Sequence, residues 1–390
     1  MKIGTAIFTY NRSSHTEQVI IALKNNYVLP DKLFLFHDGL CHEKDREEWE
    51  KVQKLIEDVD WCEKEIIVSE VNNGLANSII SGVNYMIQSC DAIIVLEDDC
   101  VPTRNFINYM VQCINYYQKE NSVYGISGYA WPIDMRQDTP EDIYFTGRIS
   151  SWGWATWKDR WQQYERDNNI VHRIRRDREK SIYLETWGSD LDSTLQYTIE
   201  GKADSWAVYW ALKCIENGGV FVTPYLSLIH NIGHDGTGVN CASSEEFEVQ
   251  LEEEERKTYV FPSSIQIMEK TEIAFAPFLG SYTAINQNMG INQNKEKVII
   301  YGAGYYFRCN EKNLNEKYNI IAFIDRNKEG YYAGRKILKS YEISNYHYEK
   351  IIIMIKDSQE CNKVKVMLEK EFKVSPMRIF EKGVLLEENK

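Results

Sequence analysis

The sequence predicts an α/β protein: a large domain built on a parallel sheet, followed by a second, smaller α/β domain. Three observations predict this class. In the first hundred residues, short apolar runs typical of buried strands alternate with helical patterns, which implies a parallel sheet with right-handed crossovers. Each of these apolar runs ends in a cluster of polar residues. A strand followed by a glycine turn appears again after residue 295, so the pattern restarts in a second domain.

The elements of the first domain follow from apolar periodicity and from the turn residues between the runs. We expect strands at residues 3–8, 33–37, 66–69, 92–96 and 123–128. We expect helices at residues 16–25, 43–58, 76–88 and 104–119. The fourth strand ends sharply, because three acids and then Pro102 follow it.

Polar clusters follow each of the first four expected strands. They are Thr9-Tyr10-Asn11-Arg12, Asp38, Asn73-Gly74 and Glu97-Asp98-Asp99. Because ligands of parallel sheets bind outside the carboxyl ends of the strands, we expect these clusters to form one binding edge.

The three consecutive acids predict a metal and diphosphate site. Adjacent carboxylates repel one another, and Mg²⁺ or Mn²⁺ would neutralise them while bridging to substrate phosphates. The alternative is an acidic loop after a core strand. For Tyr10 the alternative is packing at a strand end, and for Asp38 it is a turn with Gly39.

Composition and charge exclude some classes of function. The chain has 390 residues, 43% hydrophobic and 26% charged, with a net charge of −13. That balance is ordinary for a globular protein and argues against a nucleic-acid binder, which needs a basic surface. The local basic run at 172–180 predicts a solvated helix, with an anionic membrane or lipid phosphate as the alternative contact.

Cysteine usage and the lack of long apolar runs indicate a compartment. The nine cysteines are scattered without a Cys-x-x-Cys pair, which is typical of reduced thiols in a cytoplasm. The N-terminus runs directly into a strand without a signal-peptide pattern, and no apolar run approaches the roughly 18 residues of a membrane span. We therefore expect a cytoplasmic protein, at most peripheral to the inner face of the membrane.

Together, the Thr9–Arg12 cluster, the Asn73-Gly74 turn and the run Ile94-Val-Leu-Glu97-Asp98-Asp99 resemble nucleotide-diphospho-sugar transferases of the GT-A fold. The chain is similar to glycosyltransferase family 2 and, through Glu-Asp-Asp, to N-acetylglucosaminyltransferase I-like enzymes. The resemblance covers about residues 1 to 240. It implies a Rossmann-like GT-A domain followed by a small Rossmann-like α/β module.

The resemblance also implies roles for individual residues. The nucleotide pocket would be lined by Thr9, Tyr10 and Arg12, with Asn73 and Gly74 beside the nucleotide. Asp38 would accept a hydrogen bond from the base. Asp99 would hold the Mn²⁺ or Mg²⁺ ion, while Glu97 and Asp98 face the ribose and the donor sugar.

Four tryptophans lie within ten positions, at 152, 154, 157 and 161. Indole faces stack on sugars, so the segment predicts a carbohydrate platform, and it is similar to a run beside the donor sugar in bacterial relatives. Because Trp154, Trp157 and Trp161 have the spacing of one helix face, we assign them to packing. We keep Trp152 and Arg148 as donor-binding candidates.

Asp204 comes just before a helical pattern. It is either an N-cap of that helix or the general base that deprotonates the acceptor hydroxyl of an inverting transferase. The resemblance places the catalytic Asp in such a position after the tryptophan segment. We therefore choose Asp204 as catalytic, with Asp190 and Asp192 in reserve.

The glycine-rich turn at 230–238 carries two histidines. In GT-A enzymes a late-loop histidine often completes the metal or phosphate site, so the resemblance implies His234, rather than His230, as a metal ligand. Without the resemblance, a loop histidine bonded within the protein is the default.

We expect a GT-A domain at 1–280, with a nucleotide half at about 1–100 and an acceptor half at about 101–280. An acidic, solvated helix is expected at 245–256, a linker at 281–295 and a Rossmann-like module at 296–390. Gly302-x-Gly304, followed by Asp325, resembles a dinucleotide fingerprint, but Phe307 stands at the third glycine position. We therefore expect a structural or oligomerisation role for the module rather than cofactor binding.

These features predict a metal-dependent, inverting hexosyl- or N-acetylhexosaminyltransferase. It would use a UDP-sugar and a glycan or lipid-linked glycan acceptor, in bacterial surface polysaccharide or glycoconjugate synthesis. The alternatives are a nucleotidyltransferase that makes a nucleotide sugar, or a non-catalytic nucleotide- or carbohydrate-binding protein. A nucleotidyltransferase would be expected to carry a Gly- and Arg-rich nucleotide loop near the first strand, and residues 5–12 of this sequence lack one.

Overall fold

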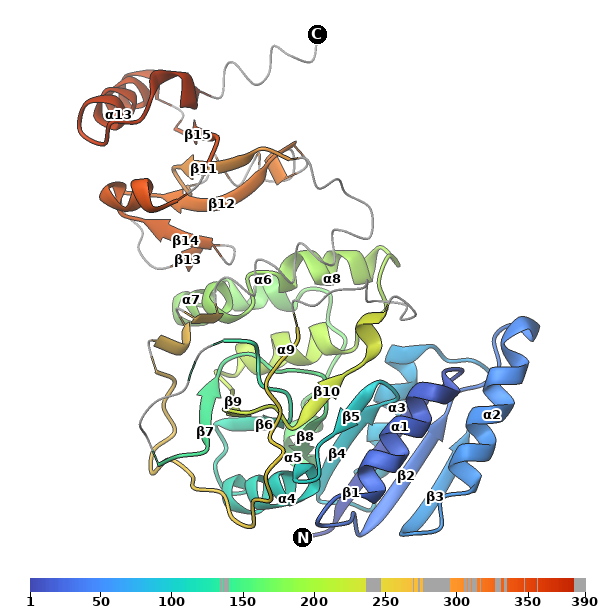
Figure 1. Cartoon of the computed structure of the whole chain (residues 1–390). Coiled ribbons are helices and arrows are strands. Elements are labelled where there is room, and N and C mark those ends of the chain that lie inside the picture. The colour runs from blue at the N-terminus through green and yellow to red at the C-terminus, as the bar shows by residue number, and fades with distance from the viewer. Residues whose placement is uncertain are drawn as a thin grey trace. The chain divides into compact units, whose positions relative to one another are not determined.

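The computed structural model divides into two compact units, Met1–Phe275 and Ala276–Lys390, each with its own sheet (Figure 1). The predicted α/β class with a second, smaller α/β unit is confirmed. Residues 281–294 of the predicted linker lie outside the described residues. The structure describes residues 1–133, 135, 140–235, 247–268, 270–272, 274–275, 295–304, 307, 310, 314–315, 317–326, 331–332, 335–346, 348–355 and 357–381.

The first half of unit 1 is the predicted alternation of strands and helices. Its strands are β1 (Ile3–Thr9), β2 (Lys32–His37), β3 (Glu63–Val68) and β4 (Ala92–Glu97), all parallel in the order β3-β2-β1-β4. Its helices are α1 (Ser13–Lys24), α2 (Arg46–Glu57, after the short η1, Glu43–Asp45) and α3 (Leu75–Met86). The predicted elements are confirmed, with ends that differ by a few residues. The carboxyl ends of the four strands therefore share one edge of the sheet.

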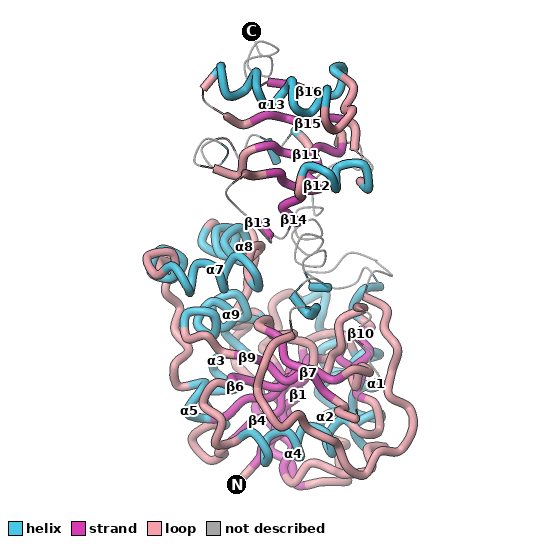
Figure 2. Tube along the Cα trace, turned by 90° about the vertical axis from the view of Figure 1, so that its left-hand side faces the viewer, coloured by secondary structure: helices cyan, strands magenta, loops and turns pink. Residues whose placement is uncertain are grey.

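The second half of unit 1 extends the same sheet to eight strands, in the order β3-β2-β1-β4-β8-β6-β9-β7. The added strands are β6 (Val123–Ser127), β7 (Ile143–Thr146), β8 (Trp154–Trp157) and β9 (Val220–Pro224). Figure 2 shows helices on both sides of these strands. The remaining helices are α4 (Phe106–Tyr117), α5 (Lys158–Trp161), α6 (Ile170–Ile174), α7 (Arg178–Trp187), α8 (Leu191–Ile199) and α9 (Ala207–Glu216).

The tryptophan segment packs as predicted but not on a helix. Trp154, Trp157 and Trp161 are fully buried, so their assignment to the core is confirmed. The helical spacing is wrong, because Trp154 and Trp157 lie on β8, which pairs antiparallel with β4 and β6. Trp154 stacks on Trp206 with ring centroids 4.8 Å apart, so the packing is set by the sheet and by the turn before α9.

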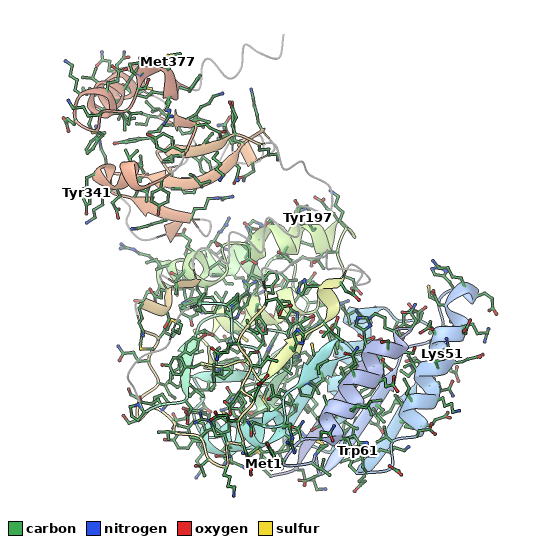
Figure 3. All side chains as sticks on the ribbon, in the orientation of Figure 1. Met1, Lys51, Trp61, Tyr197, Tyr341 and Met377 are labelled. Atoms are coloured by element: carbon green, nitrogen blue, oxygen red, sulfur yellow. The ribbon has the colours of Figure 1, made fainter. Side chains whose placement is uncertain are left out.

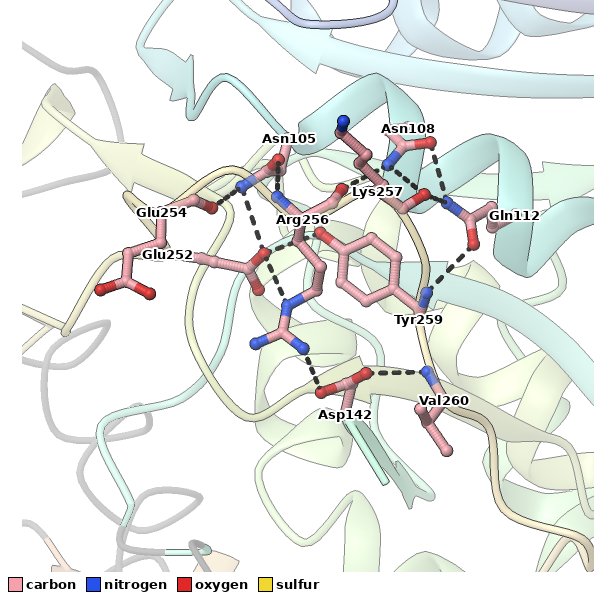
Figure 4. A network of polar contacts seen from close by, with 10 residues as sticks. All are labelled: Asn105, Asn108, Gln112, Asp142, Glu252, Glu254, Arg256, Lys257, Tyr259 and Val260. Atoms are coloured by element: carbon pink, nitrogen blue, oxygen red, sulfur yellow. Dashed lines mark hydrogen bonds and ion pairs between the residues drawn. The ribbon is translucent and has the colours of Figure 1, made fainter. Parts of the chain in front are cut away.

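The acidic segment near residue 252 is neither helical nor fully solvated in its described part, 247–256. Glu252 is buried and accepts hydrogen bonds from Asn105, Arg256 and the Tyr259 hydroxyl (Figure 4). Arg256 also forms an ion pair with Asp142, N to O 2.6 Å. The predicted solvated helix is wrong here, because these polar partners bind the segment to the first turn of α4.

In its described residues, unit 2 contains a six-stranded sheet in the order β13-β14-β12-β11-β15-β16, in which β13 is antiparallel to β14 and the other pairs are parallel. Asp325 accepts a hydrogen bond from the Ala303 backbone N–H at 2.8 Å, so one of its oxygens is used within the protein. Tyr341 and Met377 are highly exposed apolar side chains of this unit (Figure 3). Its elements are β11 (Lys297–Tyr301), β12 (Asn319–Ile324), β13 (Tyr331–Tyr332), β14 (Arg335–Leu338), η3 (Ser340–Asn345), β15 (Lys350–Ile353), α13 (Ser358–Lys370), η4 (Pro376–Arg378) and β16 (Ile379–Glu381).

Two chain-wide expectations concern thiols and membrane spans. Among the described residues, the cysteines at positions 41, 62, 90, 100, 113 and 214 are free thiols. In the part of the chain that the structure describes, no helix combines the length and apolar character needed to cross a bilayer.

Candidate functional site

The acids after β4 are met by a segment from much later in the chain. Short strand β5 (Cys100–Pro102) follows Asp99 and pairs antiparallel with β10 (Ile229–Asn231), with Asn231 opposite Cys100. The Ile232 backbone N–H then donates to the Asp99 carbonyl at 2.9 Å. This pairing brings the turn η2 (Gly233–Asp235), which contains His234, to the strand-end acids.

Gly233 allows this approach because it has no side chain. A Cβ at this position would lie 2.3 Å from Oδ2 of Asp99, closer than atoms can approach. The backbone at Gly233, directly before His234, therefore lies against the Asp99 carboxylate. His230, the histidine not chosen, lies on β10 with its ring 3.7 Å from the Glu248 carboxylate.

Arg12 contacts two of the three acids. It follows β1 and immediately precedes α1, and its carbonyl accepts hydrogen bonds from the Thr16 N–H and hydroxyl, both at 2.9 Å. Its Nε donates to Asp98 Oδ2 at 3.2 Å, and its Nη2 donates to Asp98 Oδ1 and, at 2.9 Å, to Asp99 Oδ2. Its Nη1 is buried and has no hydrogen-bond partner among the described residues.

The protonation of the acids reflects their crowding. Burial, followed by repulsion from Asp99 and Asp98, raises the pKa of Glu97 to about 8. Burial raises the pKa of Asp98 to about 6, although the Arg12 charge opposes the rise. Burial and the neighbouring carboxylates thus favour the protonated form of Glu97, which can donate a hydrogen bond.

An aromatic cluster surrounds His234. The ring of Phe247 stacks on the imidazole with centroids 5.0 Å apart, and Trp152 meets it edge-on at 5.2 Å. Trp152 also contacts Tyr129, with ring centroids 4.6 Å apart. Both His234 ring nitrogens are buried without a hydrogen-bond partner among the described residues. The predicted candidates Trp152 and His234 thus contact each other, and Gly233, directly before His234, lies against Asp99.

The residues present fit a divalent ion. Carboxylates and imidazoles are ligand types that Mn²⁺ accepts; the chain offers Asp99, which is paired with Arg12, and His234, whose ring nitrogens have no partner among the described residues. Within the described ranges, no three His, Cys, Asp or Glu side chains converge as a metal site. Such an ion would therefore rely on phosphate oxygens and water for its other ligands, as Mg²⁺ and Mn²⁺ do at diphosphate sites.

Asp38 organises the neighbouring strand ends. It is buried, and its carboxylate accepts from the backbone N–H groups of Gly39 at 3.0 Å, Asn73 at 2.9 Å and Gly74 at 3.0 Å. These contacts agree with the interpretation of Asp38 as a turn residue. A hydrogen bond between Asp38 and a nucleotide base remains a prediction. These bonds fix Asn73 and Gly74 at the start of α3.

Thr9 and Tyr10 also make contacts within the protein. The Thr9 hydroxyl is 3.1 Å from the Phe36 carbonyl and 3.0 Å from Nδ1 of His37. The Tyr10 hydroxyl donates to Asp45 at 3.3 Å and accepts from the Cys41 N–H at 3.0 Å. Their contact with a nucleotide remains a prediction.

Asp204 does not cap its own helix, since α9 has no side-chain cap. Instead its Oδ2 accepts a hydrogen bond from the backbone N–H of Ala76 at 3.1 Å, in the first turn of α3. The carboxylate is exposed and lies next to Gly74. The second half of unit 1 thus places an exposed carboxylate, held by one backbone hydrogen bond, beside the strand-end cluster at 73–74.

Arg148 and the reserve candidates are engaged elsewhere. The Arg148 guanidinium forms a two-pronged ion pair with Asp190, at 2.8 and 2.7 Å, and both side chains are buried. This ion pair is a structural contact of both side chains, and the donor contact of Arg148 and the reserve role of Asp190 remain predictions. Asp192 forms a surface ion pair with Arg175.

Three residues near His234 and Trp152 are not among those expected from the sequence: Tyr129, Phe247 and Gly233. The two aromatic residues stand in unrelated segments, so no spacing could indicate that they meet Trp152. Gly233 could have been noted as the glycine directly before His234, where a close backbone approach needs a residue without Cβ.

A family model described as C2185-like, N-terminal matches residues 294–379, which is less than half of the chain. No curated protein matches the chain significantly.

Solved structures similar to the chain include three glycosyltransferases. Mannosyltransferase PcManGT from Pyrobaculum calidifontis, in complex with GDP-Man and Mn²⁺, has a TM-score of 0.29 and 10% identity, covering 44% of this chain and 46% of its own. Glucosyl-3-phosphoglycerate synthase from Mycobacterium tuberculosis, with Mn²⁺ and UDP, has 0.26 and 12%, covering 40% and 57%. TarS 1–349 of S. aureus with UDP-GlcNAc has 0.30 and 9%, covering 40% and 46%. The match spans about half the length of each neighbour, and at these scores it carries no activity over to this chain.

Proposed function

We propose that the protein is a metal-dependent, inverting glycosyltransferase that transfers a sugar from a nucleotide diphosphate, most simply a UDP-sugar, to a glycan or lipid-linked glycan. The observation that carries the proposal is the place of Asp204. A carboxylate from the second half of unit 1 lies on the first turn of α3, beside the polar edge that the first half forms. The donor class follows from that edge, where acids, Arg12 and His234 meet.

The mechanism assigns one task to each group. A divalent ion bound by Asp99 and His234 would neutralise the charge of the leaving diphosphate. Arg12 would bind phosphate oxygens through its guanidinium. Trp152 offers an indole against the donor sugar, and Asp204 accepts the proton of the acceptor hydroxyl as that oxygen attacks the anomeric carbon. A single base on the face opposite the leaving group gives inversion.

The finer features of the proposal come from the sequence. They are a hexosyl or N-acetylhexosaminyl donor, a role in bacterial surface polysaccharide or glycoconjugate synthesis, a cytoplasmic location and an oligomeric role for unit 2. A nucleotidyltransferase would instead release pyrophosphate from a nucleoside triphosphate. A non-catalytic protein would bind nucleotide without any turnover.

The test is donor hydrolysis across a panel of nucleotide sugars with Mn²⁺, Mg²⁺ or chelator, followed by transfer to glycan acceptors. Metal-dependent release of a nucleoside diphosphate from one donor would support the proposal, and turnover unchanged by chelator would contradict it.

The Asp204→Asn variant tests the base. Asparagine retains an oxygen for the Ala76 N–H, so the contact with α3 survives while the proton acceptor is lost. We expect transfer to fall by roughly 10²- to 10⁴-fold with the fold intact. The control is Asp60→Asn, which removes an exposed carboxylate of the same type outside the candidate site. Equal rates for both variants would exclude Asp204 as the base.

A further inference from the structure

Arg12 and the proposed metal need the same carboxylate. Its Nη2 donates to Asp99 Oδ2 at 2.9 Å, and the same guanidinium is bonded to both oxygens of Asp98. We propose that Arg12 is an internal counter-cation that competes with the divalent ion for Asp99, so that metal binds tightly only when a diphosphate draws Arg12 away. This inference rests on the proposed function, which makes Asp99 a metal ligand.

The charges at the site support competition. Arg12 is mostly buried, with about a fifth of its side chain exposed, and the side chains of Asp98 and Asp99 are 9% and 14% exposed. In such a poorly solvated setting a fixed positive charge strongly opposes a second cation at the same oxygen. The guanidinium also occupies a lone pair of Asp99 Oδ2, one of the two oxygens that a metal could use, while Oδ1 is 3.5 Å from the Cys100 thiol. Arg12 therefore lowers the affinity of the empty site for metal.

The geometry also gives Arg12 an alternative partner. Nη1 is buried without a partner among the described residues, so the guanidinium has an unused donor. A diphosphate at this edge offers several anionic oxygens, which bind a guanidinium in the same forked manner as Asp98 does. Bonding to phosphate would release Asp99. Nucleotide and metal would then bind cooperatively, and each would raise the affinity of the other by the same factor.

The experiment measures Mn²⁺ binding to the full chain without nucleotide, from the electron paramagnetic resonance signal of free Mn²⁺. The forms compared are wild type, Arg12→Gln, Arg12→Lys and Asp99→Asn. The matched control is Arg175→Gln, which removes the same charge from an exposed one-to-one pair with Asp192. Thermal melts of each form confirm folding.

We expect Arg12→Gln to bind Mn²⁺ more tightly than wild type by roughly 5- to 150-fold, the usual range of coupling between two sites. Arg12→Lys keeps the charge but cannot engage both carboxylates, so its affinity should lie between the two. Arg175→Gln should match wild type, and Asp99→Asn should lose binding.

Equal or weaker Mn²⁺ binding by the Arg12 variants, with binding still lost in Asp99→Asn, would overturn this inference and leave the proposed function standing. Arg12→Lys alone decides the matter in the same way if Arg12→Gln does not fold. Absence of Mn²⁺ binding in every form, or binding that Asp99→Asn leaves unchanged, would overturn both this inference and the metal role in the proposed function.

Discussion

The interior and the carboxyl edge of unit 1 both pair an arginine with carboxylates. In the interior, Arg148 pairs with Asp190; at the edge, Arg12 faces Asp98 and Asp99. The edge also holds two histidines that each stack on an aromatic ring. His37 lies 4.5 Å from Trp49, measured between ring centroids, and His234 lies 5.0 Å from Phe247.

The two regions differ in how completely the groups are matched. Arg148 meets one carboxylate through two bonds, whereas Arg12 meets two carboxylates beside a third and keeps one nitrogen without a partner. At the edge, His37 contacts the Thr9 hydroxyl through Nδ1 and leaves Nε2 without a partner, and neither nitrogen of His234 has a partner among the described residues. The interior ion pair therefore uses both carboxylate oxygens, while groups at the edge keep unused hydrogen-bonding capacity.

The largest expected difference is in stability. Asp190→Asn leaves the Arg148 charge buried and uncompensated, so the free energy of unfolding should fall by about 3–5 kcal/mol. Asp99→Asn leaves Arg12 paired with Asp98 and should change it by less than about 1 kcal/mol. Urea unfolding curves compare the two variants. The double variant Arg148→Met with Asp190→Leu should recover most of the loss, and equal losses for Asp190→Asn and Asp99→Asn would break the comparison.

The next effect is a pH dependence. Burial lowers the pKa of His37 to about 4, while the unfolded chain takes up its proton near the ordinary value of about 6.5. As pH falls from about 6.5 to 4 the unfolded state binds the proton first, so stability falls by about 3 kcal/mol in that window and is fully present above it. His37→Asn should remove this slope from unfolding curves. The exposed His172→Asn should keep the wild-type slope, and an unchanged slope in His37→Asn would contradict the assignment.

The smallest effect concerns an exposed pair of the same residue types. Arg175 and Asp192 lie 2.7 Å apart with about half of each side chain exposed. A double-mutant cycle, Arg175→Gln with Asp192→Asn, should give a coupling energy below about 1 kcal/mol, because water screens the pair. The same cycle at Arg148 and Asp190 should give a coupling several times larger. Similar coupling energies for the two pairs would show that burial does not strengthen the Arg148–Asp190 interaction.

The first half of unit 1 could be predicted from the sequence because its contacts are local and periodic. Strands β1, β2 and β4 and the helices between them follow from apolar spacing, and the ends of parallel strands must share an edge. The tryptophan segment was placed in the core correctly but on the wrong element. Its spacing fits a helix face, and only pairing with β4 makes it a strand.

The rest of the candidate site depends on pairings that leave no local pattern. Nothing near residue 252 indicates that Glu252 is buried by Asn105 and Tyr259. The ion pair between Arg148 and Asp190 joins residues 42 positions apart, so no pattern in the sequence indicates it. The approach of Asp204 to Ala76 likewise required the three-dimensional structure.

The contact between Asp204 and Ala76 spans 128 residues of sequence, and this separation orders the assembly of the site in time. Arg12 meets the acids as soon as β1 pairs with β4, early in the growing chain. The segments that supply Asp204 and His234 are synthesised much later, and closing such long loops is slow. We therefore expect Asp98 and Asp99 to be paired with Arg12 already in the nascent N-terminal half. Arg12, which we propose competes with metal at the complete site, would also compensate part of the buried negative charge before Asp204 and His234 are in place.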